Sequence, residues 1–428
     1  MVQRTTLNRP AARWTSAALA CVCTALLAAC NSGGGSVQTA SGQAADAYTQ
    51  DFPIFYVKRY SVPKNPDDLR LLRFAIPSAD LFMRTRAAPS GIETNLTQRI
   101  TGTGTSTAAN YDVKDVAVSA DGKLMAFAMR GPLVKNMQQD KAPSWRIWKY
   151  VIATDTLSQV IDPTTDPDPL TVNDVAPQFM PDGRIVFSST RQRQSEAVLL
   201  DEGAPQFTAD DEDRNEPAFV LHVMNADGTN IHQVSFNQSH DRDPTVLQSG
   251  RFMWTRWDHA PGKADAMHLY SSDPDGTDLQ LLYGANSHAT GPDATGTNTA
   301  TIEFVKTHEM QDGRVLALIR PYTGTDFGGD LEVIDVNTYV ENTQPAAAGS
   351  LLSGPAQTRA TPNTVLTVPG PSPGGRFYDG FPLWDGTGRI LVTWSQCRLL
   401  DTTVTPNVIV PCTSSALANP NPTLAAPL

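Results

Sequence analysis

The chain has 428 residues, 40% of them apolar, with 30 glycines and 32 prolines, a composition that suits short strands and turns better than long helices. Its formal charge of −11 disfavours nucleic acid and anionic membrane surfaces as partners, because both would repel an acidic body. The length exceeds one ordinary domain, but a repeat array can hold it in a single body.

Residues 1–29 have the pattern of a secretory signal. Three arginines precede an apolar stretch from residue 17 to residue 29, and no acidic residue occurs among them. The run from Leu27 to Cys30 resembles the lipobox of bacterial lipoproteins, which implies cleavage before Cys30 and lipidation of its thiol. Asn31 replaces the Asp that favours inner-membrane retention in that family, so we expect an outer-membrane anchor facing the periplasm or the cell surface. Residues 30–50 would form its flexible tether.

Hairpin signals recur through residues 51–395. Each has a Gly-bearing turn between two apolar runs, in which glycine supplies the positive φ that the turn requires. These glycines are Gly122, Gly183, Gly250, Gly313 and Gly388, separated by 61, 67, 63 and 75 residues. A second hairpin follows in most repeats, as at Asp227-Gly228 and Asp275-Gly276. Two hairpins make a four-stranded antiparallel sheet, and radial repetition protects the edges of such sheets.

The sequence therefore predicts an all-β propeller of four-stranded antiparallel blades over residues 51–395. Six blades is the preferred count, and five to seven are compatible with the pattern. The polar segment 192–214 is expected to be an insertion on one face. Its acidic run, Asp210 to Asp213, is interpreted as a solvated loop, with Ca²⁺ binding as the alternative.

Three segments resemble known propeller families. The runs Pro177 to Phe187 and Leu221 to Thr229 are similar to the WD-like repeats of TolB. The run Ser239 to Asp258 resembles the propeller-type middle domain of the hydrazine synthase alpha subunit, and the resemblance covers roughly residues 52–395. That subunit carries c-type haem, but this chain has no Cys-x-x-Cys-His motif, so no c-type haem is expected.

Histidines and carboxylates gather between residues 240 and 308, and both are suitable ligands for first-row metals. Some TolB-like propellers are lyases that hold a metal with several histidines at the ring axis. The resemblance therefore implies a candidate divalent-metal site. Its ligands would be His240, His259, His288 and His308.

A structural interpretation of the same region competes with the metal site. The carboxylates of Asp241 and Asp243 would accept backbone hydrogen bonds in a turn at the start of a blade. Asp115 and Asp174 occupy similar places without a histidine beside them, which favours this structural role for the aspartates.

The tail, residues 396–428, contains the two cysteines that remain after Cys30. In an oxidising compartment Cys397 and Cys412 are expected to form a disulfide, with two free thiols as the alternative. The sequence contains neither Gly-x-Ser-x-Gly nor a phosphate-binding glycine loop, and Asp312 stands where a His-Glu-x-x-His motif would need its second histidine. No catalytic residue is predicted.

Together these features predict an exported lipoprotein whose propeller is a non-catalytic scaffold for a protein or an envelope component. The membrane would be contacted through the lipid anchor, and nucleic acid is not an expected partner. The alternative is a metal-dependent envelope enzyme, similar to a polysaccharide lyase, or a redox-complex subunit similar to the hydrazine synthase alpha subunit without its haem site.

Overall fold

The computed structural model divides the chain into two units, Met1–Thr49 and Gln50–Leu428. It describes residues 52–59, 68, 70–71, 78–88, 90–102, 110–133, 143–166, 172–205, 208–214, 216–260, 264–288, 301–323, 328–412 and 423–424. The predicted signal, Cys30 and the tether lie outside these residues. In the described part, the longest helix has 9 residues, and no helix is long and apolar enough to cross a membrane.

Blade 1 contains β1 (Ile54–Arg59), β2 (Ala79–Arg84) and β3 (Glu93–Asn95), followed by the short helix α1 (Gln98–Thr101). Blade 2 contains β4 (Asp112–Val118), β5 (Leu124–Arg130), β6 (Arg146–Val151) and β7 (Thr156–Gln159), with the 3₁₀ turn η2 (Ile152–Thr154) between the last two strands. Blade 3 contains β8 (Asp174–Phe179), β9 (Ile185–Ser189), β10 (Val220–Met224) and β11 (His232–Gln233), with α3 (Arg193–Asp201) after β9.

Blade 4 contains β12 (His240–Val246), β13 (Phe252–Ala260), β14 (Ala264–Ser272) and β15 (Gln280–Tyr283). Blade 5 contains β16 (Ile302–Glu309), β17 (Val315–Pro321), β18 (Asp330–Ile334) and β21 (Gln357–Arg359), with the small hairpin of β19 (Tyr339–Glu341) and β20 (Gln344–Pro345) inserted before β21. Then follow the pair β22 (Arg376–Pro382) and β23 (Ile390–Ser395), and a sheet of β24 (Arg398–Asp401), β25 (Val408–Pro411) and β26 (Thr423–Leu424).

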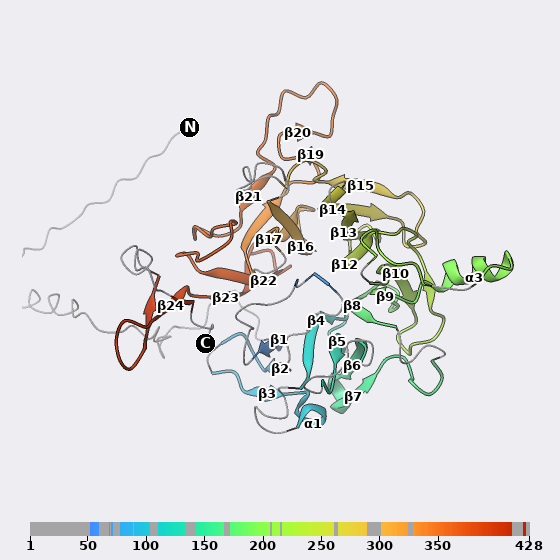
Figure 1. The fold of residues 1–428 in the computed structure, drawn as a ribbon, viewed down its shortest axis with the longest axis horizontal. Helices are drawn as coiled ribbons and strands as arrows, with labels where there is room; N and C mark the ends of the chain where they lie inside the picture. The colour runs from blue at the N-terminus through green and yellow to red at the C-terminus, as the bar shows by residue number, and fades with distance from the viewer. Residues whose placement is uncertain are drawn as a thin grey trace, which may run out of the picture. The chain divides into compact units, whose positions relative to one another are not determined.

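Within the unit Gln50–Leu428, the blades follow one another in chain order around a common centre, from blue through green to orange (Figure 1). All strand pairs in blades 1 to 5 are antiparallel, which confirms the predicted propeller and places the blade count inside the predicted range. The preferred count of six is not reached among the described residues. In the described part of the chain, the segment expected to form the sixth blade contains β22 and β23, and the chain then continues into the sheet of β24.

The core lies between neighbouring blades, because the second strand of each complete blade is apolar on both faces. All five residues of β9 are buried, and Phe187 packs against Ala126 and Ile147 of blade 2. Trp254 of β13 packs in the same way against Val186 of blade 3. Full burial of such strands stabilises the array through the hydrophobic effect, at roughly 1.5 to 3 kcal/mol for each large side chain.

The first strand of four blades contains a β-bulge with one residue in the left-handed region. The register shifts lie within β4, β8, β12 and β16. The left-handed residues are Asp115 (φ 58°), Ala176 (51°), Asp243 (49°) and Lys306 (49°). Asp tolerates this conformation better than most residues do. The structure thus places Asp115 and Asp243 inside bulged strands, whereas Asp174 and Asp241 lie at strand starts.

The glycine turns at one end of the blades fall into two groups. A Cβ atom on Gly228, between β10 and β11, would lie 2.2 Å from the carbonyl oxygen of Val160 at the end of blade 2. A Cβ atom on Gly276 would likewise lie 2.0 Å from the carbonyl oxygen of Val234 at the end of blade 3. By contrast, a Cβ on Gly183 or Gly250 would have no neighbour within 4 Å. Gly228 and Gly276 therefore provide close backbone contact between consecutive blades.

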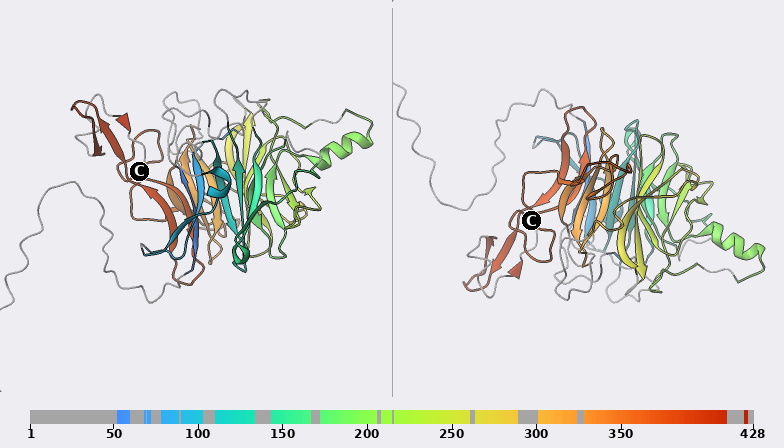
Figure 2. Two further views of the ribbon diagram at one scale, coloured as in Figure 1. Left: turned by 90° about the horizontal axis from the view of Figure 1, so that it is seen from below. Right: turned by 90° about the horizontal axis from the view of Figure 1, so that it is seen from above.

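At the other end of the blades, long connections carry added structure. The connection between β9 and β10 contains α3, which projects from the sheets (Figure 1, Figure 2), and the acidic run that was expected to be a solvated insertion. After β23, a disulfide joins Cys397 to Cys412, with their Cα atoms 5.5 Å apart, at the base of the hairpin of β24 and β25.

Replacing Glu332 in β18 by glutamine is expected to raise the free energy of unfolding by about 1 to 2 kcal/mol at pH 8 and to leave it unchanged at pH 4. Burial and, to a smaller extent, the nearby Asp330 carboxylate raise the pKa of Glu332 to about 7, against the opposing effect of Arg359. Because the folded-state pKa is raised, the stability contributed by this group is fully present below its unfolded pKa and is lost as the pH rises through about 7.

Urea unfolding between pH 4 and pH 8 measures this effect, and Glu202→Gln at the exposed end of α3 is the control. The same gain at both pH values would show that the shape of the side chain, and not its charge, is responsible.

Candidate functional site

A buried group of two imidazoles and one carboxylate lies at one end of blade 4. We call Asp211, His240 and His259 the His–Asp cluster; one ligand atom from each lies within 4.8 Å of those from the others. His240 begins β12 and His259 lies near the end of β13, and the antiparallel pairing of these strands, with His240 opposite Trp257, brings the two rings together. Asp211 comes from the connection between β9 and β10, where Asp210 forms a β-bridge with Pro217.

Hydrogen bonds fix the proton positions in this cluster. His240 Nδ1 accepts the backbone N–H of Phe219 at 3.2 Å, so the proton of neutral His240 lies on Nε2, which is 3.1 Å from Asp211 Oδ2. His259 Nδ1 lies 2.7 Å from the same oxygen. Asp211 Oδ2 therefore accepts an N–H from both imidazoles.

Trp257 holds the two rings in place. Its indole stacks on His259, with ring centroids 3.9 Å apart, and on His240 at 5.2 Å. Its Nε1 donates to the hydroxyl of Tyr322 at 2.9 Å, and the guanidinium of Arg70 lies 4.8 Å from the ring. The structure thus gives Trp257, a residue of the repeat motif, a position beside the cluster.

Further acidic side chains surround the cluster. Ser239 Oγ lies 2.5 Å from Glu212 Oε1 and 2.9 Å from Asp258 Oδ1, and its single proton can be donated to only one of them. Burial acts to raise the pKa of Asp258, but hydrogen bonds from His268 and Ser239 outweigh it and lower that pKa. This end of blade 4 therefore concentrates negative charge next to imidazole nitrogens.

The four histidines proposed as metal ligands are divided among three places. His240 and His259 belong to the cluster. His288 instead lies beside His268, with the two rings tilted and their centroids 5.3 Å apart, and burial lowers the pKa of His288. His308, in β16, has its Nε2 3.9 Å from Asp379 Oδ1.

Asp379 belongs to a second group of charges, on the first strands of the blades. Its carboxylate lies 3.4 Å from Lys306 Nζ. Burial acts to raise the pKa of Asp379, but Lys306 and His308 outweigh it and lower the pKa to about 2. Lys114 and Asp115 form a similar pair, with Lys114 Nζ 3.6 Å from Asp115 Oδ2. Each lysine in this group therefore neutralises a neighbouring carboxylate.

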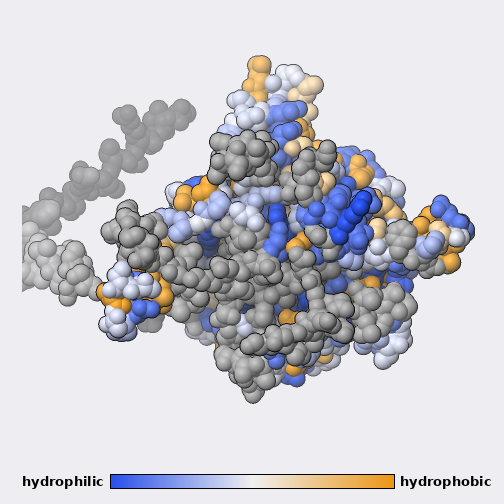
Figure 3. Space-filling view, viewed as in Figure 1, coloured by the Kyte–Doolittle hydropathy of each residue, from blue (hydrophilic) through white to orange (hydrophobic). Residues whose placement is uncertain are grey.

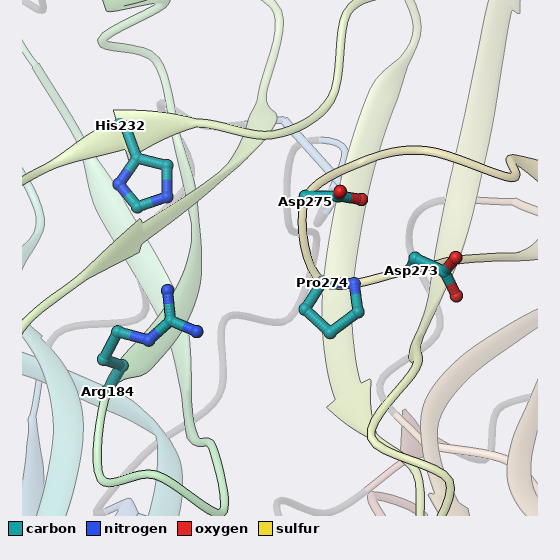
Figure 4. A pocket seen from close by; sticks show the side chains of 5 residues that line it. All are labelled: Arg184, His232, Asp273, Pro274 and Asp275. Atoms are coloured by element: carbon teal, nitrogen blue, oxygen red, sulfur yellow. The ribbon is translucent and has the colours of Figure 1, made fainter.

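A cavity of about 400 Å³ opens between blades 3 and 4, at the end that carries the glycine turns (Figure 4). It is lined by Arg184, His232, Asp273, Pro274 and Asp275. The charged groups there already have partners, since Arg184 pairs with Asp182 at 2.7 Å and Asp273 pairs with Arg251 at 2.6 Å. Among the described residues, the His–Asp cluster is therefore the stronger candidate site.

Asp241 and Asp174, predicted as structural aspartates, are buried acceptors at the same end of the blades. Asp241 accepts hydrogen bonds from Trp254 Nε1 and Arg256 Nε, both at 2.7 Å. Asp174 pairs with the buried Arg191 at 2.8 Å. These contacts hold the ends of β12 and β8, so the structure places both aspartates in the framework around the site.

No protein-family model matches this sequence, and no curated protein matches it. Among solved structures, hydrazine synthase from Kuenenia stuttgartiensis aligns with a TM-score of 0.53 and 15% identity, over 81% of this chain and 42% of that chain. TolB from Acinetobacter baumannii aligns with a TM-score of 0.41 and 15% identity, over 81% of this chain and 62% of that chain. Oligogalacturonate lyase from Vibrio parahaemolyticus aligns with a TM-score of 0.36 and 11% identity, over 73% of this chain and 71% of that chain.

The match to hydrazine synthase thus spans less than half of that protein's chain. At 15% identity this likeness concerns the fold, and it agrees with the antiparallel blades described above. The chain is a β-propeller in fold, of the kind that also occurs in hydrazine synthase.

Proposed function

We propose that the chain is an exported, lipid-anchored binding propeller that holds a protein or another envelope component. The N-terminal pattern ending in Cys30 supports the anchor at the outer membrane. The propeller supports the scaffold, because packed blades form a rigid body on which exposed edges and loops can bind. The observation that carries the proposal is the edge of β23 that faces no other strand in the described part of the chain.

In blades 2 to 5 the second strand is paired on both sides and largely buried. Among the described strands, β23 pairs with β22 alone, although Ile390–Ser395 is as apolar as those central strands. Val392 is 39% exposed and Trp394 is 42% exposed, and Phe381 and Trp384 beside them are 55% and 48% exposed. An apolar edge strand with unpaired backbone groups is a template for strand addition.

We infer that the partner adds an extended segment to β23. Main-chain hydrogen bonds would supply affinity, and the exposed aromatic and aliphatic side chains would select alternate residues of the incoming strand. Other apolar surface lies over α3 and over the hairpin of β24 and β25 (Figure 3), where Leu200 and Ile409 are 62% and 47% exposed. In that hairpin β25 is also paired on one side only among the described strands, but it is shorter than β23 and ends in a proline, so β23 is the preferred edge.

The test is a photoreactive side chain placed at Thr393 of the full chain in its own envelope, with and without Val392→Lys. We expect cross-linking to one partner that falls at least tenfold in the variant, because a charge on the edge blocks strand addition. The matched control is Val118→Lys on β4, where Val118 is 45% exposed. Equal cross-linking in both variants would contradict the proposal, and a Cys30→Ser chain shows whether the contact depends on anchoring.

A metal-dependent envelope enzyme is the second candidate function, because the His–Asp cluster offers donors of the type that such enzymes use. It becomes the preferred function if the purified chain has an activity that requires the cluster and survives Val392→Lys.

A further inference from the structure

We propose that the His–Asp cluster binds one divalent first-row transition metal ion through Asp211, His240 and His259. This inference does not depend on the binding function proposed above. Two imidazoles and one carboxylate are the donors that Zn²⁺ and related ions take, whereas Ca²⁺ and Mg²⁺ prefer oxygen donors alone. The three donor atoms already lie within 4.8 Å of one another, so they need to move only a short way to reach one ion.

The hydrogen bonds in the cluster mark the place of the ion. Two imidazole N–H groups now converge on Asp211 Oδ2, at 2.7 Å and 3.1 Å. A cation between the three groups replaces these two protons and satisfies the same carboxylate. The negative charge nearby favours it, since Glu216 Oε1 lies 3.9 Å from His240 Nε2.

A second carboxylate lies near His259, and a short movement would bring it within hydrogen-bond distance of the free ring nitrogen. When Nδ1 binds the ion, the ring proton moves to Nε2, which lies 3.9 Å from Asp213 Oδ2. Metal-bound histidines usually donate their other N–H to a carboxylate or a carbonyl, which fixes the ring and strengthens the ligand. The stacked Trp257 holds the same ring in orientation.

Metal binding by His240 requires the loss of one hydrogen bond of its ring. Its Nδ1 now accepts the N–H of Phe219. When Nε2 binds the ion, Nδ1 carries the proton, and two N–H donors then face each other. The Phe219 amide must turn away, so metal binding should loosen the segment that connects Asp211 to β10.

The experiment measures binding of Zn²⁺ and Co²⁺ to the purified full chain by equilibrium dialysis and by the visible absorption of bound Co²⁺. We expect one ion per chain and an association constant that falls at least tenfold in Asp211→Asn and in His259→Ala. The matched control is His232→Ala, since His232 lies in the cavity at the other end of the blades and should leave binding unchanged.

Two measurements on the unaltered chain keep the proposal testable if a variant fails to fold. Zn²⁺ should raise the midpoint of thermal unfolding, whereas Mg²⁺ and Ca²⁺ should not, and Zn²⁺ should accelerate hydrogen exchange at the Phe219 amide. Absence of stoichiometric Zn²⁺ binding would overturn the site. Equal stabilisation by Ca²⁺, or unchanged exchange at Phe219 in the loaded chain, would overturn this set of ligands.

Discussion

Replacing Arg191 by alanine should lower the free energy of unfolding by about 3 kcal/mol. Arg191 is 1% exposed and lies between two buried carboxylates, at 2.7 Å from Asp166 and 2.8 Å from Asp174. Burial acts to lower the pKa of Arg191, but the two carboxylates outweigh it and raise that pKa, so the guanidinium stays charged. Removing it leaves buried negative charge with less compensation.

The expected loss lies at the low end of the range for a broken buried ion pair, about 3 to 5 kcal/mol, because other cations remain nearby. Arg146 and Arg193 each lie 3.5 Å from an oxygen of Asp166. Urea unfolding at pH 7 measures the change. Arg184→Ala is the control, because the exposed pair of Arg184 with Asp182 contributes about 0 to 1 kcal/mol. A loss for Arg191→Ala no larger than that of the control would show that the buried pairs add no stability.

Gly228→Ala should destabilise the chain by about 3 kcal/mol or more, whereas Gly183→Ala should cost about 1 kcal/mol. Both glycines have nearly the same φ, 85° and 86°, so the strain of an alanine at positive φ is common to both. They differ in their surroundings. The new methyl group at residue 228 would lie 2.2 Å from the carbonyl oxygen of Val160, and at residue 183 it would meet nothing within 4 Å.

Parallel denaturation of the two variants separates the cost of conformation from the cost of contact between blades. Gly276→Ala should behave like Gly228→Ala, and Gly250→Ala like Gly183→Ala, because these pairs repeat the two environments in blade 4. Equal losses in all four variants would mean that the neighbouring blades can move apart without cost.

Most of the propeller could be predicted from local sequence. The glycine turns at residues 183 and 228 lie between apolar runs, and the structure places hairpins at both. The number of blades could not be predicted in the same way. Residues 390–395 have the composition of a central strand, but a strand's second partner depends on where the following chain goes, and here it goes to the sheet of β24.

The candidate site was only partly visible in the sequence. His240 and His259 flank one hairpin, so their proximity follows from strand pairing. Asp211 was interpreted as part of a solvated loop, because irregular insertions have no periodicity that indicates which side chain turns inward. The sequence feature that could have indicated Asp211 was the acidic run. This run lies in the connection that ends at the same edge of the sheets as His240. His288 and His308 follow later strands, and their spacing could not show that they lie in other groups.

The two ends of blades 2 to 4 are subject to different constraints on change. At the end with Gly228 and Gly276, each turn packs directly against the backbone of the preceding blade. An added residue there would therefore disturb two sheets at once. At the opposite end, the connection between β9 and β10 holds a helix and the acidic run without interrupting the strand order. New loops, and with them new ligands, can be acquired at that end while the other end preserves the architecture.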